Sequence, residues 1–483
     1  MSIQDVDRPT TSPRSSNAGN QSGDIAYLSA VELVELYRQR KLSPLEVTRS
    51  ILDRTKRFDP QINAFALLDA ESALASAADS EKRWQRGEPL GLVDGVPVAL
   101  KDLVLAKGWP TLRGSRAVDP NQDWSEDSPA TARLREHGAV LLGKTTTSEF
   151  GWKGVGDSLL TGITRNPWNV AHTPGGSSGG SGAAAALGFG PLHVATDGGG
   201  STRLPAAHSG AFGFKQTFGR VPVYPPSQNG TLFHVTPLTR SVRDAALLLD
   251  VIARPDTRDW NALPPADIAW GRGIDEGIKG LRIAFSPALG YAQVDPEVEK
   301  IVADAVKVFA DHGAIVELVD PGIEDPLPIF LTFWQAGAAK LLASFAPDRR
   351  ALTEPGLQAA AEQGRAIDGV TYLQAVDRRE ALGRHFSQFH QKWDLLITPT
   401  TAHPASAINA SQADLAERPI RSPFTYPFNL TQQPAASVPA GLTKAGLPVG
   451  LQIVGVKFAD ATVLRAARAF EISRPFAPPK DPS

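Results

Sequence analysis

The chain has 483 residues, a formal net charge of −2, 42% hydrophobic residues and no cysteine. A nearly neutral chain without a basic block gives no electrostatic support for nucleic-acid or anionic-membrane partners. The lack of cysteine excludes disulfides, thiolate metal sites and cysteine nucleophiles. The histidines are scattered and form no metal-binding motif, so we expect neither a metal nor another cofactor.

The N-terminal residues 1–24 are rich in Ser, Thr, Asn and Pro and lack the apolar core of a secretory signal. This composition predicts a disordered extension. No hydrophobic segment approaches the ~20 residues that span a bilayer. We therefore expect a cytoplasmic protein that does not associate with membranes. Residues 25–87 are expected to form N-terminal helices packed on a core of residues 88–483, in a single domain overall.

Helix signals open the ordered part of the chain. Ser29 with Glu32, and Ser43 with Glu46, fit the capping box, and the second pair has a proline at the first helical position. A third helix is expected over residues 70–86, because a glycine follows it directly.

From residue 95 onward, strand and helix patterns alternate. Short apolar runs predict strands, and longer amphipathic stretches predict helices. Expected strands cover residues 95–102, 139–143, 280–286, 314–320, 394–400, 434–440 and 450–455, and expected helices cover 128–138, 296–312 and 460–473. This alternation predicts an α/β fold with a largely buried sheet. The less regular segments 255–280 and 321–390 are expected to be insertions around a site.

Three segments match motifs that their surroundings contradict. Residues 138–145 match the phosphate-loop pattern, but their apolar interior predicts a buried strand after a helix, the reverse of what that loop requires. Residues 175–179 match the G-x-S-x-G elbow, which must follow a strand, whereas polar residues and prolines precede them. Residues 173–186, TPGGSSGGSGAAAA, have linker composition, yet their alanines predict the start of a helix within one continuing pattern.

A second glycine-rich segment suggests catalysis. Gly198, Gly199 and Gly200 directly precede Ser201, after an apolar run that predicts a strand. Glycines reach φ > 0 and leave their N–H groups unshielded, so several of these groups can converge on one point. Convergent N–H groups beside a serine are what an oxyanion hole requires. Upstream, Lys101 ends another apolar run.

These segments together resemble a known family. The sequences VALKD (98–102), GGSSGGSGAAAA (175–186) and TDGGGSTRLPAA (196–207) occur in the order found in the amidase signature family, and the spacing of 24 residues between Ser177 and Ser201 agrees with it. The resemblance extends over residues 25–475. It implies a mixed, twisted central β-sheet enclosed by α-helices.

The resemblance also implies the roles of the site residues. Ser201 matches the family's nucleophile, Ser177 its bridging serine in a cis peptide, and Lys101 its base. The oxyanion hole would use the N–H groups of Gly198, Gly199, Gly200 and Ser201. Supporting residues that shape the loops without reacting would be Asp197, Arg203 and Ser178.

Elementary chemistry is consistent with this triad. Serine is a weak nucleophile that needs an adjacent base. Lysine is a base only when neutral, and burial in an apolar strand lowers its pKa. The N-terminus of the helix expected after Ser177 disfavours the charged lysine further. We expect Ser177 to relay the proton between Ser201 and Lys101, and then to return it to the leaving amine.

The resemblance leaves the substrate open. It implies a serine amidohydrolase that cleaves the carbonyl–nitrogen bond of an amide, an anilide or a carbamate (urethane) through an acyl-enzyme, and by family habit a homodimer. A small-molecule substrate of apolar or aromatic character is favoured by the candidate pocket residues Phe150, Trp152, Phe233, Tyr426 and Phe428.

Two alternatives remain. One is the glutaminase component of glutamyl-tRNA(Gln) amidotransferase, its A subunit, which releases ammonia from glutamine for a partner enzyme. The polar N-terminal extension and the sequence GFKQT at 213–217, where the family usually has GLKPT, disfavour it. The other is a non-catalytic binding protein on the same fold, which the complete triad disfavours.

Overall fold

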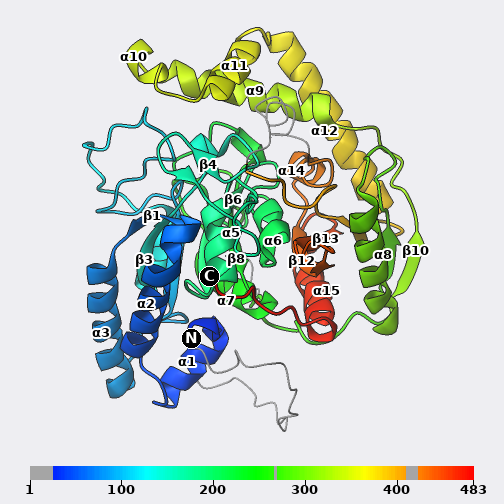
Figure 1. Ribbon diagram of the computed structural model, residues 1–483. Coiled ribbons are helices and arrows are strands. Elements are labelled where there is room, and N and C mark those ends of the chain that lie inside the picture. Colours follow the sequence, from blue (N-terminus) through cyan, green and yellow to red (C-terminus); the bar gives the residue numbers. More distant parts are fainter. Residues whose placement is uncertain (1–24, 266–268, 409–421, 483) are drawn as a thin grey trace.

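The computed structural model describes residues 25–265, 269–408 and 422–482 (Figure 1). The segment 1–24, for which disorder is predicted, lies outside the described residues. A mixed sheet of 11 strands runs through the molecule, and helices enclose it. This arrangement confirms the predicted α/β class.

The strand order in the sheet is β1-β3-β2-β6-β8-β7-β12-β13-β11-β9-β10. Neighbours are parallel in β3-β2-β6 and in β11-β9-β10, and antiparallel elsewhere. The bounds are β1 Phe65–Leu68, β2 Pro97–Lys101, β3 Val140–Thr145, β6 Leu192–Asp197, β7 Phe212–Lys215, β8 His234–Thr239, β9 Arg282–Phe285, β10 Ile315–Leu318, β11 Leu395–Pro399, β12 Ala435–Leu442 and β13 Pro448–Gly455. A separate hairpin pairs β4 (Asp157–Ser158) with β5 (Gly162–Ile163).

The central strands are buried along their whole length, which explains their unbroken apolar runs. The segment that matches the phosphate-loop pattern is one of them. It forms β3 after helix α4 (Pro129–Glu136), as predicted. Its lysine, Lys144, is buried and donates hydrogen bonds to the Val104 carbonyl and to Thr111 Oγ1. Lys144 is therefore part of the buried interior and does not belong to an exposed phosphate-binding loop.

The N-terminal segment supplies helices α1 (Ala30–Arg38), α2 (Pro44–Ile62) and α3 (Ala70–Arg86). Both predicted capping boxes are present, and α3 ends at a glycine with φ 75°. The prediction of helices alone was incomplete, because β1 lies between α2 and α3 and pairs with β3 at the edge of the sheet. A strand of four residues is too short to show a clear alternation.

Helices cover both faces of the sheet. The Cβ of a residue replacing Gly450 on β13 would meet Ala207 of α6 (Arg203–Ser209), whereas one at Gly455 would meet Val463 of α15 (Asp460–Ser473). Positions an odd number of residues apart point to opposite faces of a strand, so α6 and α15 lie on opposite sides. Helix α5 (Gly179–Ala186) packs with α6, while α7 (Val242–Ile252) and α8 (Pro296–Asp311) pack with α15.

The irregular segment 321–390 is helical and lies across one end of the sheet, at the top of Figure 1. It contains α9 (Leu327–Ala343), α10 (Pro347–Arg350), α11 (Pro355–Arg365) and α12 (Gly369–Phe389). Helix α9 packs against α11, α12 and the short α14 (Tyr426–Leu430). In the other irregular segment, 255–280, the described residues form neither helix nor strand.

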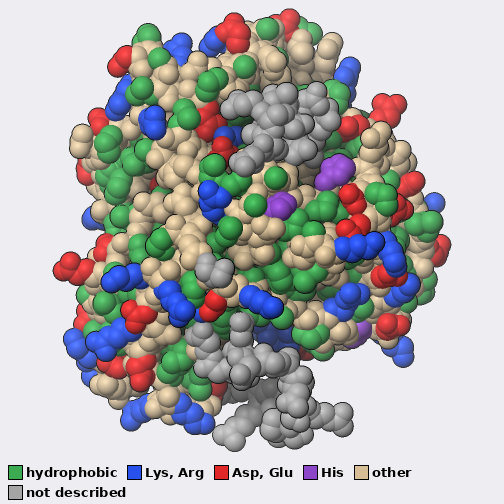
Figure 2. Space-filling model, viewed as in Figure 1, with side chains coloured by type: hydrophobic (Ala, Val, Ile, Leu, Met, Phe, Trp, Pro, Cys, Tyr) green, Lys and Arg blue, Asp and Glu red, His purple; other side chains and the backbone are tan. Residues whose placement is uncertain are grey.

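The visible face of the molecule carries acidic and basic side chains intermixed, with hydrophobic side chains between them (Figure 2). Within the described ranges, no helix combines the length and the apolar character needed to cross a bilayer.

Candidate active site

Lys101 lies at the end of β2, between the parallel strands β3 and β6. Its Nζ donates to Ser177 Oγ at 2.6 Å and to Thr196 Oγ1, on β6, at 2.8 Å. Lys101 and Ser177, which are 76 residues apart, are thus brought into direct contact. Because parallel strands end together, the lysine and the threonine reach the same edge of the sheet.

Lys101 is fully buried, and both of its acceptors are neutral hydroxyl groups. Burial lowers the pKa of Lys101 well below its usual value, while the Asp197 carboxylate acts in the opposite direction. A neutral amine in contact with a hydroxyl can accept a proton from it. The electrostatic requirement for a lysine base is therefore met.

The segment 173–186 is among the most enclosed parts of the chain. Nearly all its residues are buried, and the peptide bond between Gly176 and Ser177 is cis. A Cβ at Gly176 would lie 2.3 Å from the Val155 carbonyl oxygen, so only glycine fits there. Ser178 ties this segment to its neighbours, since its N–H donates to the Ser201 carbonyl at 3.2 Å and its Oγ to the Thr196 carbonyl at 3.2 Å. The segment is a packed element and not a linker.

Ser201 lies in the loop between β6 and α6, with 7% of its surface exposed. Its Oγ makes no hydrogen bond to any described residue, so the predicted relay contact with Ser177 is not formed in this state. Among the described residues, no hydrogen bond engages the N–H groups of Gly198, Gly199 or Ser201 either. These three donors are available to an oxyanion.

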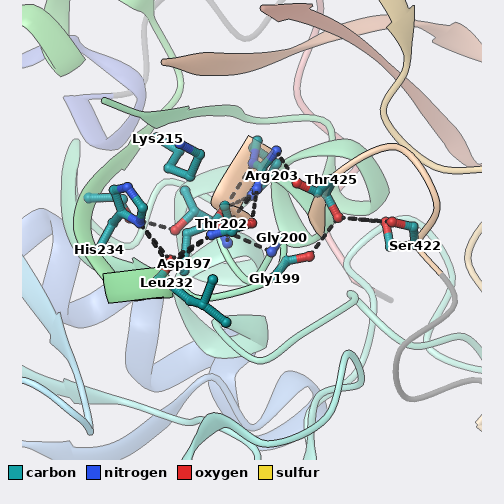
Figure 3. Close-up of polar contacts among 12 residues, drawn as sticks. Asp197, Gly199, Gly200, Thr202, Arg203, Lys215, Leu232, His234, Ser422 and Thr425 are labelled. Atoms are coloured by element: carbon teal, nitrogen blue, oxygen red, sulfur yellow. Dashed lines mark hydrogen bonds and ion pairs between the residues drawn. The ribbon is translucent and has the colours of Figure 1, made fainter. Parts of the chain in front are cut away.

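Gly200 differs from the prediction. Its N–H donates to Asp197 Oδ1 at 2.8 Å, so we assign no oxyanion role to Gly200. The glycine is required there for another reason. Its φ is 129°, and a Cβ would lie 2.3 Å from Thr425 Oγ1, which donates to the Gly199 carbonyl at 2.7 Å. Gly200 therefore allows Thr425 to fix the loop (Figure 3).

Asp197 and Arg203 form a buried ion pair at the two ends of this loop (Figure 3). The guanidinium donates to both carboxylate oxygens at 3.0 Å. Its remaining donors reach the Thr425 carbonyl at 3.0 Å, Gln452 Oε1 at 2.8 Å and Asn429 Oδ1 at 2.7 Å. The pair ties the loop to segments far along the chain.

The charge state of this cluster follows from its contacts. Burial by itself would raise the pKa of Asp197, but the adjacent Arg203 outweighs it and holds that pKa below its usual value. Burial lowers the pKa of Lys215 well below its usual value, and Arg203 adds to the effect. Burial likewise lowers the pKa of His234, whose Nδ1 lies 3.2 Å from the Asp197 carbonyl (Figure 3). The adjacent Arg203 thus keeps the Asp197 carboxylate charged.

A pocket opens above Ser201. Phe330 and Trp334 of α9 stack on each other with ring centroids 5.1 Å apart, and Tyr426 also stacks on Phe330 at 5.2 Å. The pocket is lined by Gly151, Trp152, Lys153, Gly154, Gly199, Ser201, Leu204, Phe330, Trp334 and Ser422. Three of these ten residues are aromatic, and helix α9 supplies two of the three rings.

The five aromatic residues that were expected to line the pocket lie in different parts of the structure. Trp152 lines the Ser201 pocket, whereas Phe150 and Phe233 line a neighbouring pocket. Tyr426 lies behind Phe330, and Phe428 packs in the core against Phe386, with ring centroids 5.5 Å apart.

Phe330, Trp334 and Thr196 are site residues that no sequence motif indicates. The first two belong to the segment 321–390, which is predicted to be an insertion around a site, but its aromatic residues carry no motif. Metal chemistry receives no support from the described residues, which contain no group of three or more His, Cys, Asp or Glu side chains suited to hold a metal ion.

The chain is similar to known proteins over most of its length. The Amidase family model matches residues 46–464. Acylamidase from Rhodococcus erythropolis is 35% identical over 467 residues, covering 95% of this chain and 98% of that protein. The A subunit of glutamyl-tRNA(Gln) amidotransferase from Geobacter sp. (strain M21) is 34% identical over 474 residues, covering 93% and 97%. The crystal structure of a bacterial aryl acylamidase of the amidase signature family superposes with a TM-score of 0.87 at 31% identity, covering 93% of this chain and 97% of the other.

Proposed function

Because the chain belongs to the amidase signature family and is thus an amidase that acts on carbon–nitrogen bonds, we propose that it cleaves a small-molecule acyl amide, anilide or carbamate through an acyl-enzyme. The observation that carries the proposal is the contact of 2.6 Å between the buried Lys101 and Ser177, next to Ser201, which lines an aromatic pocket. The cytoplasmic location and the homodimer stay predictions.

In the proposed mechanism, Ser201 Oγ attacks the carbonyl carbon while its proton passes to Ser177 Oγ, whose own proton passes to Lys101 Nζ. The N–H groups of Gly198, Gly199 and Ser201 stabilise the oxyanion of the tetrahedral intermediate. The carbon–nitrogen bond then breaks, and the proton returns through Ser177 to the leaving nitrogen. Water hydrolyses the acyl-enzyme by the same relay. The side chain of Ser201 must rotate towards Ser177 for the first transfer, which substrate binding would favour.

The pocket supports an apolar or aromatic substrate. Trp152, Phe330 and Trp334 present ring surfaces beside Ser201, and flat aromatic walls bind a flat aromatic group by offset stacking. This favours anilides over small aliphatic amides. The 35% identity to an acylamidase and the structural similarity to an aryl acylamidase support the same choice.

A glutaminase of the amidotransferase type is the second candidate, because the A subunit of such an enzyme is 34% identical to this chain. The two functions predict different substrates for the isolated protein. An amidase of anilides hydrolyses them without a partner. A glutaminase component releases ammonia from glutamine and is active on little else.

A substrate panel tests the proposal. The purified chain would be assayed with matched amides, anilides, carbamates and esters, and with glutamine, and kcat/KM would be compared. We expect anilides to be preferred. Hydrolysis of glutamine alone would favour the second candidate, and no turnover of any member would remove both.

Covalent labelling tests the nucleophile separately. A fluorophosphonate reagent should modify Ser201, and peptide mass spectrometry would locate the adduct. Ser201→Ala should prevent labelling. Ser227→Ala, a change of a serine in the neighbouring pocket, is the matched control and should leave it intact. An adduct on any other residue would contradict the assignment of Ser201.

A further inference from the structure

A second pocket adjoins the Ser201 pocket and contains a single charged side chain, Arg113. Its walls are otherwise apolar or neutral, formed mainly by Leu103, Phe150, Val223, Tyr224, Phe233 and Val235. Among the described residues that line it, none is acidic. An arginine cannot lose its charge in a protein. This pocket is therefore an apolar cavity with one fixed positive charge.

Residues of the two pockets lie close together beside the proposed triad, although no residue lines both pockets. Leu103 and Phe150 line the second pocket, and Gly151 lines the first. A Cβ at Gly151 would lie 3.0 Å from the Leu103 side chain and 3.1 Å from Ser177 Oγ. Gly151 of the first pocket therefore lies next to Leu103 of the second pocket and next to Ser177.

The guanidinium of Arg113 makes no hydrogen bond and no ion pair within 4.0 Å to any described residue. The carboxylate that acts on it is Asp102, which also accepts from the Gly114 N–H at 3.1 Å and lies 3.9 Å from Lys144 Nζ. Arg113 and Lys144 thus share one carboxylate, and Arg113 is not bonded to it. Burial lowers the pKa of Arg113, as expected for a cation removed from water.

The backbone holds Arg113 firmly in this position. Arg113 and Phe150 both have left-handed φ values, 58° and 48°, and each is followed by a left-handed glycine. The Phe150 N–H donates to the Arg113 carbonyl at 2.8 Å, which joins the two turns. Left-handed conformations in residues other than glycine cost free energy, and strained residues cluster at active sites and ligand-binding loops.

We propose that Arg113 binds a carboxylate carried by the substrate, so that the preferred substrates are amides with an aromatic body and an anionic end. This inference rests on the proposed hydrolysis at Ser201. A guanidinium in an apolar pocket binds a carboxylate through two parallel charge-assisted hydrogen bonds. Most of the side chains that line this pocket are apolar, as contact with the hydrocarbon between the carboxylate and the scissile amide would require.

Kinetics with paired substrates test the proposal. N-acetyl-4-aminobenzoate carries the carboxylate on the amine side and would be compared with its neutral methyl ketone analogue, 4′-acetylacetanilide. Succinanilate carries it on the acyl side and would be compared with pentananilide. In the wild type, one of the two carboxylates should be preferred over its neutral partner. In Arg113→Met, that preference should fall by about tenfold or more, mainly through KM.

Arg116→Met is the matched control, because Arg116 is exposed and does not line the pocket. It should keep the wild-type preference. Arg113→Lys, which retains the charge without the fork, should recover part of it. An Arg113→Met preference equal to that of the wild type would overturn the proposal, as would the absence of any preference in the wild type.

A binding measurement separates this inference from the proposed function. Calorimetric titration with benzoate requires no turnover. Benzoate should bind the wild type, and its affinity should fall by about tenfold or more in Arg113→Met. Binding that depends on Arg113, without hydrolysis of any amide, would contradict the proposed function alone. Hydrolysis of neutral anilides, without any benzoate binding, would contradict the Arg113 inference alone. If Arg113→Met fails to fold, the same titration on Arg113→Lys decides, since an unchanged affinity there contradicts recognition by the fork.

Discussion

Two buried cationic side chains lie close to Ser201 and behave in opposite ways. Lys101 contacts the hydroxyl group of Thr196, and Arg203 contacts the carboxylate of Asp197. Thr196 and Asp197 are consecutive on β6. A single step along one strand therefore separates the partner of a lysine that has no bonded counterion from the partner of a fully paired arginine.

The difference shows how one site can hold both a base and a fixed charge. Burying a charge costs free energy unless a partner offsets it. The Arg203 pair has that partner, and its remaining donors also find acceptors. Lys101 has only hydroxyl groups, so its neutral form is favoured. The residue type matters as well, since lysine loses its proton when buried and arginine does not.

Removing the lysine base should have the largest effect. Lys101→Ala should lower kcat by about three orders of magnitude or more, because no other base in the described ranges contacts Ser177, and residual activity from the oxyanion donors should remain. Steady-state kinetics on an anilide measure it. Lys107→Ala, a change of an exposed lysine on the loop after the same strand, should retain normal kcat. A Lys101→Ala enzyme with near-normal kcat would remove lysine from the mechanism.

Breaking the paired cation should act first on stability. Asp197→Asn leaves Arg203 buried without a counterion and should lower the free energy of unfolding by about 3–5 kcal/mol. Chemical denaturation at pH 7 measures it. The pKa of Asp197 is depressed in the folded state, so its contribution is complete above the unfolded pKa and is lost as the pH falls through the folded one.

The matched control is Asp304→Asn, which breaks an exposed ion pair with Lys300 on α8. It should change stability little, because water solvates both groups. Equal losses in the two variants would mean that burial of the Asp197 pair is not what matters.

The pH profile tests the charge state of Lys101 directly. Burial lowers the pKa of Lys101, and activity requires the neutral amine. Activity should therefore be present above that pKa and be lost as the pH falls through it. The acidic limb of kcat/KM, which reports the free enzyme, should lie well below the usual lysine value of about 10.4. A rate that still rises steeply up to pH 10 would contradict a neutral Lys101.

The smallest expected effect concerns the hydroxyl group beside the base. Thr196→Val removes one acceptor from Lys101 Nζ and should lower kcat/KM by about two- to tenfold, as expected for one hydrogen bond. Because this acceptor stabilises the ammonium form, the acidic limb should also move to lower pH. Thr55→Val, a change of a buried threonine whose Oγ1 donates within α2, should leave the limb in place. If the acidic limb of the kcat/KM profile did not move in Thr196→Val, Thr196 would have only a packing role.

Local patterns predicted much of the fold. The capping boxes placed the starts of α1 and α2, and the amphipathic run 460–473 coincides with α15. These features depend on residues a few positions apart, which the sequence displays directly. Strand β1 was missed, because its four residues form a strand only through pairing with β3.

In the candidate site too, some features can be read from local sequence motifs and others depend on contacts between distant segments. The available chemistry can be predicted from the sequence, because the chain has no cysteine and holds Lys101, Ser177 and Ser201 in motifs of recognisable order and spacing. How these groups are used depends on the three-dimensional arrangement. It directs the Gly200 N–H to Asp197 and brings α9 over Ser201. It also leaves Arg113 in its pocket without a bonded counterion. The physical reason is that hydrogen-bond geometry and burial depend on segments far apart in the chain, as in the contact of Arg203 with Gln452 across 249 positions.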